Sequence, residues 1–193
     1  MGRKIRDSYT ESEGVLKMIF NPTGLDGAFL IEPDRFEDER GFFLTGFHRE
    51  KFKERGIDLD IDQNSVSYNR KKGTLRGMHY QVAPYEQAKL VSCFKGAIYD
   101  VIIDFREGSS TYGKWVSVDL DERTLRALYV PKGFAHGFQA LEDDTVVFYA
   151  ISGPYRPEHA EGIRWDDRAF NIDWPLEPSV LSEKDAGWPD HKG

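Results

Sequence analysis

Short apolar runs that end at glycine, proline or acidic residues follow one another along most of the chain. Residues 114–120 alternate most clearly, with Val116, Val118 and Leu120 on one face and polar or aromatic residues on the other. This period of two is typical of a half-buried strand. Further strands are predicted at residues 28–31, 42–44, 89–94, 97–105, 128–130, 138–141 and 145–151.

The turns and the lack of helical pattern between strands indicate the fold class. Lys95-Gly96 separates two of the runs and predicts a hairpin. A doubly wound fold needs a helix between successive strands, and this pattern has none. We therefore expect an all-β fold, a sandwich or barrel, with only a few short peripheral helices.

One helix is predicted, over residues 47–55, which are rich in lysine, arginine and glutamate. Phe47 and Phe52 are its apolar anchors, and Gly56 can end it.

The length of 193 residues indicates a single domain. Residues 1–20 are charged and polar and are expected to be a loose N-terminal arm. Residues 21–193 are expected to form the domain, with a polar, frayed tail over 185–193.

Charge and cysteine content exclude several classes of protein. With 26 basic and 33 acidic residues the net charge is −7, which argues against nucleic-acid or anionic-membrane partners. No apolar run approaches the ~18 residues of a membrane span. A single cysteine, Cys93, excludes an internal disulfide and a multi-cysteine zinc site. With no targeting signal visible, we expect a cytoplasmic protein.

Two of the five histidines lie in unusual settings. His79 and His136 each lie near glycines and aromatic residues inside the strand-rich region. A barrel interior would bring such positions together, although either histidine alone is more often a packing or surface residue. A metal-binding barrel usually shows a His-x-His pair, and here Gln81 occupies the partner position. We therefore expect no protein-bound metal.

Three further residues are candidates for chemistry. Tyr149 lies in an apolar run, so its hydroxyl needs a partner. Arg76 and Lys89 flank His79 and are either surface charges or an anion site. Residues 162–167 form a polar turn in the simplest interpretation.

Several motifs, in order along residues 25–176, resemble those of the dTDP-4-dehydrorhamnose 3,5-epimerase family. They are Asp-Glu-Arg-Gly-Phe-Phe (38–43), Gly-Thr-Leu-Arg-Gly-Met-His-Tyr-Gln (73–81), Lys-Leu-Val (89–91) with residues 96–101, Pro-Lys-Gly-Phe-Ala-His-Gly-Phe (131–138), Tyr-Arg-Pro-Glu (155–158), Gly-Ile-Arg-Trp-Asp-Asp (162–167) and Ile-Asp-Trp-Pro (172–175).

The resemblance implies a cupin-like jelly roll and a homodimer with strands shared between subunits. It implies metal-free epimerisation at C3 and C5 of a nucleotide-linked 4-keto-6-deoxyhexose, dTDP-4-dehydro-6-deoxy-D-glucose. The family's general base falls on His79, its orienting carboxylate on Asp167 and its proton-donating tyrosine on Tyr149. Lys89 is our candidate to stabilise the enolate.

The resemblance also implies a set of substrate-binding residues. Positions lining the sugar and phosphate pocket, or reaching the nucleotide, fall on Arg40, Phe43, Gln63, Arg76, His136 and Tyr155.

The chain departs from the usual family pattern at Thr45, Ser65, Ala150 and Arg168. These departures keep alternatives open: an epimerase that inverts only C3 or only C5, or one that uses another nucleotide. A nucleotide-sugar-binding barrel without catalysis and a metal-dependent cupin are further alternatives.

Overall fold

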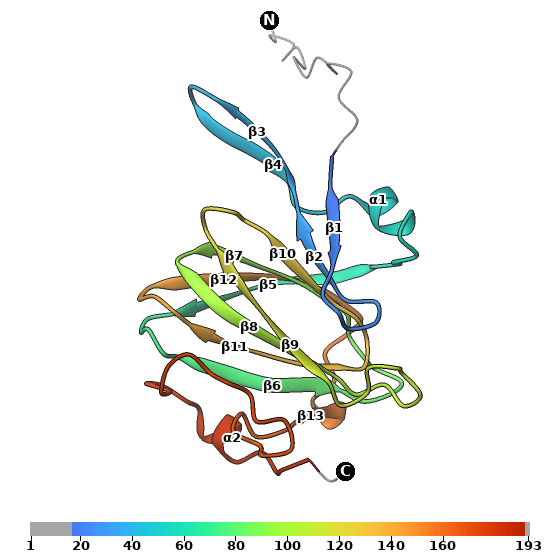
Figure 1. The fold of residues 1–193 in the computed structure, drawn as a ribbon, viewed down its shortest axis with the longest axis vertical. Helices are drawn as coiled ribbons and strands as arrows, with labels where there is room; N and C mark the ends of the chain where they lie inside the picture. The colour runs from blue at the N-terminus through green and yellow to red at the C-terminus, as the bar shows by residue number, and fades with distance from the viewer. Residues whose placement is uncertain (1–16, 192–193) are drawn as a thin grey trace, which may run out of the picture.

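The computed structural model describes residues 17–191, which form a sandwich of two antiparallel sheets (Figure 1). The six-stranded sheet consists, in spatial order, of β1 (Ile19–Pro22), β2 (Phe29–Glu32), β10 (Ala127–Val130), β7 (Lys89–Lys95), β12 (Thr145–Ser152) and β5 (Ile61–Asn69). The five-stranded sheet consists of β13 (Ala160–Gly162), β6 (Leu75–Gln81), β11 (Phe134–Ala140), β8 (Ala97–Asp104) and β9 (Trp115–Asp121). The predicted all-β class is confirmed.

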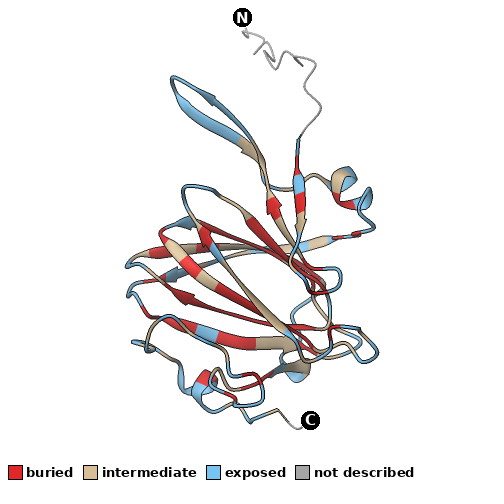
Figure 2. Ribbon diagram, viewed as in Figure 1, coloured by how far each residue is buried: buried red, intermediate tan, exposed pale blue. Residues whose placement is uncertain are grey.

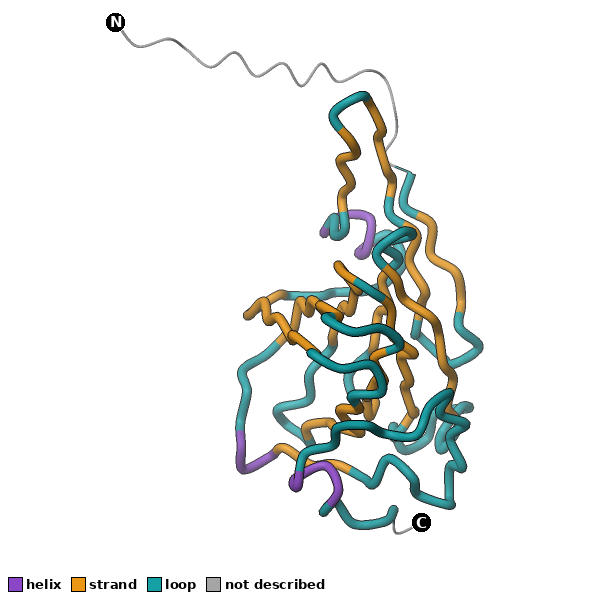
Figure 3. Tube along the Cα trace, turned by 90° about the vertical axis from the view of Figure 1, so that its left-hand side faces the viewer, coloured by secondary structure: helices purple, strands orange, loops and turns teal. Residues whose placement is uncertain are grey.

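Within residues 17–191, a separate hairpin and three short helical segments accompany the two sheets. The hairpin of β3 (Asp34–Asp38) and β4 (Gly41–Thr45) projects from one end of the sandwich. Helix α1 (Arg49–Lys53), the 3₁₀ turn η1 (Pro157–His159) and helix α2 (Glu183–Ala186) lie around the sheets. A side view places α2 at the end opposite the hairpin (Figure 3). Among residues 17–191, no helix is long and apolar enough to cross a membrane.

The main apolar core fills the space between the two sheets. Val91 and Leu128 of one sheet and Ile102, Leu120 and Phe138 of the other are buried in it. Figure 2 shows this burial concentrated in the sandwich strands, while most of the projecting hairpin is exposed. Since apolar side chains on the inner faces exclude water together, this core is the main source of stability.

The alternation predicted for residues 114–120 is confirmed by strand β9. Val116 and Val118 pack against the core between the sheets, where Leu120 is fully buried. Trp115 packs on the opposite face of the sheet, in a second cluster with Ile103. The period of two therefore separates two apolar clusters here, because both faces of this sheet are covered.

The predicted helix is shorter than residues 47–55, since α1 covers only Arg49–Lys53. Its anchors pack as expected: the rings of Phe47 and Phe52 lie 4.8 Å apart, and Phe52 is fully buried. Strand β5 was missed, because most of its inward-facing residues, such as Gln63 and Ser65, are polar and hide the alternation.

Both predicted chain ends need correction. Residues 1–16 of the expected arm lie outside the described residues, but Met18 and Phe20 are buried in an apolar cluster with Phe52. The tail expected to fray from residue 185 is packed, and Asp185 is only 5% exposed. Its polar composition concealed this packing, because the contacts that hold it come from segments distant in sequence.

Strands β6 and β11 approach each other unusually closely at Gly77 and Gly137. A Cβ atom at Gly137 would lie 2.5 Å from Met78 Sδ and 2.9 Å from the Arg76 carbonyl oxygen. The pairing of these strands sets His79 directly opposite His136. The absence of a side chain at Gly137 therefore allows the strand contact that brings the two histidines together.

We predict that Gly137→Ala lowers the free energy of unfolding by about 1–3 kcal/mol, because the added methyl group overpacks the β6–β11 contact. Urea denaturation monitored by fluorescence measures the change. Gly46→Ala is the matched control, since its Cβ would meet only Leu44 Cδ1, at 3.9 Å. Equal stability of the two variants would contradict the steric account.

Candidate active site

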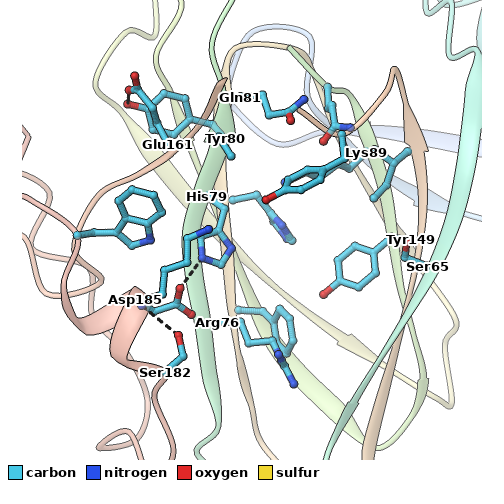
Figure 4. A pocket seen from close by; sticks show the side chains of 18 of the residues that line it. Ser65, Arg76, His79, Tyr80, Gln81, Lys89, Tyr149, Glu161, Ser182 and Asp185 are labelled. Carbon is cyan, nitrogen blue, oxygen red and sulfur yellow. Dashed lines mark hydrogen bonds and ion pairs between the residues drawn. The ribbon is translucent and has the colours of Figure 1, made fainter. Parts of the chain in front are cut away.

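A cavity of about 440 Å³ opens between the two sheets (Figure 4). One wall comes from β5, β7 and β12, the other from β6 and β11, and residues of the α2 segment close one side. Most of the residues expected at the site line it: Gln63, Arg76, His79, Lys89, His136, Tyr149 and Tyr155.

Strand register explains why residues distant in sequence meet in this cavity. On the six-stranded sheet, Tyr149 lies opposite Ser65, and Ile151 lies opposite both Lys89 and Gln63. Since side chains two apart along a strand share a face, these positions all project toward the other sheet. Figure 4 shows Tyr149 and His79 on opposite walls of the cavity.

His79 is paired with a carboxylate from the C-terminal segment. Its Nε2 lies 2.6 Å from Asp185 Oδ1, and the Gly77 backbone N–H donates to Asp185 Oδ2 at 3.4 Å. Burial of Asp185 raises its pKa, but the hydrogen bonds from His79 and Gly77 outweigh burial and lower the pKa below its usual value. An ionised Asp185 has no proton to give, so Nε2 carries the proton and Nδ1 remains as the basic nitrogen.

Asp167, expected to orient His79, does not contact that side chain. Its two carboxylate oxygens accept backbone N–H groups, one from Ala169 at 2.8 Å and one from His191. The expected contact between Asp167 and His79 is thus wrong, because the Asp167 carboxylate accepts hydrogen bonds from its own turn and from the C-terminal segment. Asp185 occupies the orienting position instead.

A local signal in the sequence could have shown that the segment around Asp185 is structured. Ser182 stands three residues before it, and the Ser182 hydroxyl oxygen accepts the Asp185 backbone N–H at 3.0 Å as the cap of α2. A serine followed at this spacing by an acidic residue is a helix-start pattern. Together with Trp188, it marks the segment as one that can pack rather than fray.

A second histidine–carboxylate pair lies deeper in the cavity wall. His136 Nε2 lies 2.5 Å from Asp100 Oδ1, and both side chains are buried. Burial lowers the pKa of His136 although Asp100 opposes the shift. Sequence reasoning did not single out Asp100, although an acidic residue within the apolar run 97–104 is itself a signal of a buried partner.

Lys89 and Tyr149 face the cavity from the six-stranded sheet. Burial lowers the pKa of Lys89 to about 8, and the charge of Asp100 opposes this effect. Burial raises the pKa of Tyr149, so its hydroxyl keeps its proton at neutral pH. The Tyr149 ring packs edge-on to the His136 ring, with centroids 6.2 Å apart.

Arg76 lines the cavity, where its Nε donates to Asn69 Oδ1 at 2.8 Å and its Nη2 donates to the Tyr68 carbonyl at 3.4 Å. These bonds hold the guanidinium in place, and a cation fixed there suits an anionic ligand.

Gln81 occupies the position where a metal-binding barrel would carry histidine. Its side chain instead forms hydrogen bonds to backbone groups. Its amide nitrogen donates to the carbonyls of Tyr85 and Pro154, and its oxygen accepts the Arg156 N–H. Within residues 17–191 no group of three or more histidine, cysteine, aspartate or glutamate side chains could hold a metal ion.

Arg40 and Phe43 do not line the cavity of their own chain. Both belong to the β3–β4 hairpin region, which projects away from the end of the sandwich that holds α2 (Figures 1 and 3). The Arg40 side chain pairs with Asp38 at the hairpin turn, and the Phe43 ring is 58% exposed.

The cavity of this β sandwich holds an oriented histidine on one wall and a neutral tyrosine and a lysine on the other. This arrangement is typical of the active site of an enzyme that uses acid–base chemistry. The chain belongs to the dTDP-4-dehydrorhamnose 3,5-epimerase family, whose sequence pattern matches residues 22–192.

Individual similar proteins are consistent with this family assignment. The dTDP-4-dehydrorhamnose 3,5-epimerase of Sinorhizobium fredii is 44% identical over 90% of this chain and 89% of its own. A dTDP-4-dehydrorhamnose 3-epimerase of Streptomyces niveus is 38% identical over 87% of this chain and 81% of its own. The crystal structure of the Bacillus anthracis 3,5-epimerase, with TDP and pyrophosphate bound, has a TM-score of 0.88 at 39% identity and covers 91% of this chain and 100% of its own.

We predict that Lys89 titrates near pH 8 in the folded protein, because burial disfavours its charged form. In the Asp100→Asn variant, Lys89 should titrate at a lower pH than in the wild type, since the negative charge of Asp100 stabilises the charged ammonium. Carbon-13 NMR of labelled lysine Cε against pH measures both midpoints. Asp173→Asn, outside the cavity, is the control; an unchanged midpoint in Asp100→Asn would contradict the coupling.

Proposed function

We propose that this protein inverts C3 and C5 of dTDP-4-dehydro-6-deoxy-D-glucose, giving dTDP-4-dehydro-L-rhamnose. The observation that carries the proposal is the His79–Asp185 pair on one wall of the cavity, with Tyr149 on the opposite wall. A sugar ring held between the walls has a base on one face and an acid on the other, as inversion at carbon requires.

The chemistry follows from the C4 ketone of the substrate. The ketone acidifies the protons on C3 and C5, because the electron pair left behind delocalises onto O4 as an enolate. His79 Nδ1 takes the proton from one face, and Asp185 stabilises the imidazolium that forms. Tyr149 gives its proton to the same carbon from the other face. The two residues then exchange protons with water before the second carbon reacts.

Lys89 supplies positive charge for the enolate oxygen. Its ammonium group is withdrawn from water in the cavity wall, where a charge interacts more strongly with a developing oxyanion. Because the pKa of Lys89 is about 8, this stabilisation is present below that pH and is lost as the pH rises through it. The mechanism includes neither a redox step nor a protein nucleophile, so it uses no cofactor.

Four further residues are proposed to bind the substrate. Arg76 carries a fixed cation in the cavity lining and suits the diphosphate. His136, fixed by Asp100, lies beside the tyrosine and suits the sugar. Gln63 and Tyr155 also line the cavity.

We also propose a homodimer in which the β3–β4 hairpin reaches a second subunit. Phe36, Phe42 and Phe43 are each about half exposed on this projecting hairpin, a large apolar surface for two strands. Arg40 and Phe43 would then meet the nucleotide in the partner's cavity rather than in their own. A cytoplasmic location is proposed as well, since the buried Cys93 is a free thiol, as expected in a reducing compartment.

A C3-only epimerase is the second candidate, favoured by the similarity to the Streptomyces niveus 3-epimerase. Of the departures from the family pattern, Ser65 shares the cavity with the proposed acid, because it lies opposite Tyr149 on the neighbouring strand and lines the cavity. Ala150 instead lies in the apolar cluster with Phe52, on the other face of β12, so it can act on Tyr149 only indirectly.

Proton exchange tests the proposal directly. Incubation with dTDP-4-dehydro-6-deoxy-D-glucose in D₂O should place deuterium at both C3 and C5, observed by NMR, with the product trapped by a rhamnose-forming reductase. Deuterium at one carbon alone would establish the mono-epimerase. Exchange only with GDP-, CDP- or UDP-linked sugars would reassign the nucleotide, and binding without exchange would establish a non-catalytic barrel.

We predict that His79→Ala loses about 10²–10⁴-fold in kcat, because it removes the base. Tyr149→Phe should lose less activity overall, or should stop after one inversion. Water would then have to replace the tyrosine as proton donor, and it does so poorly at one of the two carbons. Both rates are measured by the same NMR assay. His159→Ala, on η1 and outside the cavity, is the control and should stay near the wild-type rate. A near-wild-type rate for His79→Ala would rule out the base assignment.

A further inference from the structure

The carboxylate that orients His79 is carried by a helix too short to hold its own position. Helix α2 has four residues, Glu183–Ala186, and an isolated helix of that length is not stable in water. The segment before it is attached to the start of β6, where the Leu75 N–H donates to the Val180 carbonyl at 3.0 Å. The position of Asp185 therefore also depends on the contacts that the chain makes after α2.

Residues 187–191, here called the C-terminal strap, lie across the loop that follows β13. The Trp188 ring packs so closely on Gly162 that an added Cβ would clash with it. The Arg164 N–H donates to the Pro189 carbonyl at 3.2 Å, and the Arg164 side chain pairs with Asp190 at 3.5 Å. The first of these contacts is beside the site, since the Trp188 ring also lies 6.4 Å from the His79 ring.

The far end of the strap is fastened by Asp167. One oxygen of this carboxylate accepts the Ala169 N–H of its own turn, and the other accepts the N–H of His191. The His191 ring stacks on Phe105 at 5.0 Å, with the planes 10° apart, and contacts Phe170. Asp167 is 5% exposed, so an unsatisfied N–H here would be costly.

We propose that Asp167 is a positioning residue that anchors the C-terminal strap through His191 and thereby holds Asp185 against His79. The proposal deepens the proposed function and rests on it for the kinetic readout. Asp167 touches neither His79 nor the cavity, so its influence on the reaction passes through the strap.

Asp167→Asn tests this role with little change in shape. An amide has one acceptor oxygen in place of two, so either Ala169 or His191 must face an NH₂ group and lose its hydrogen bond. Because a displacement of about 1 Å in a catalytic group can cost up to about 10²-fold, we expect kcat to fall about tenfold while KM changes little.

A double-mutant cycle distinguishes positioning from general destabilisation. Asp185→Asn alone should lower kcat more than Asp167→Asn, and the double variant should be no slower than Asp185→Asn, because the strap then has no carboxylate to position. Asp173→Asn is the control, a carboxylate in the same C-terminal part of the chain that lies outside the strap and the cavity. A wild-type kcat for Asp167→Asn, or losses that multiply in the double variant, would overturn the proposal.

Hydrogen exchange provides a readout that does not need turnover. Amides 183–191 should exchange faster in Asp167→Asn than in the wild type or in Asp173→Asn, and unchanged exchange would overturn the proposal. If the wild type turned over no nucleotide sugar, the proposed function would fail, while exchange would still decide the anchoring. His191→Pro is the second variant, because proline has no N–H to donate to Asp167 and the bond is lost whichever way the amide in Asp167→Asn faces. Faster exchange of the strap amides and a lower kcat in His191→Pro would support the proposal, and wild-type values would overturn it.

Discussion

Burial of ionisable groups between two packed sheets is the constraint on which the chemistry of this protein depends. The same removal from water lowers the pKa of Lys89 to about 8, lowers that of His136 and raises that of Tyr149. Each shift favours the neutral form of the group, as low polarity requires. The cavity thus holds a neutral acid and a lysine that is still charged at neutral pH, which is the combination that enolate chemistry uses.

The two-sheet architecture also separates the proposed catalytic groups. The histidine stands on the five-stranded sheet and the tyrosine on the six-stranded sheet, so the proposed base and acid face each other across the gap. Neither sheet alone could address both faces of a sugar ring. A β sandwich suits epimerisation for this reason, since its inner faces converge on one cavity while its strands keep each side chain fixed.

The site is completed from the chain end. Asp185 belongs to a short helix that has little stability of its own, and contacts from Leu75 on one side and from Gly162, Arg164 and Asp167 on the other enclose it. In the proposed mechanism the strands and the terminal segment have different roles, since the strands carry His79 and Tyr149 and the segment carries Asp185, which sets the tautomer of His79. The apolar packing of the sandwich supports both.

The sequence by itself determined the class of fold, the family and seven of the residues that line the cavity, because alternation and local motifs depend only on neighbours along the chain. It predicted His79, Lys89, His136 and Tyr149 at the site without showing how they meet. Tertiary structure alone decided that Asp185 rather than Asp167 pairs with His79, and that the polar tail is packed. The His79–Asp185 pair joins residues 106 positions apart, and a contact of that span leaves no period or spacing in the sequence from which it could be derived.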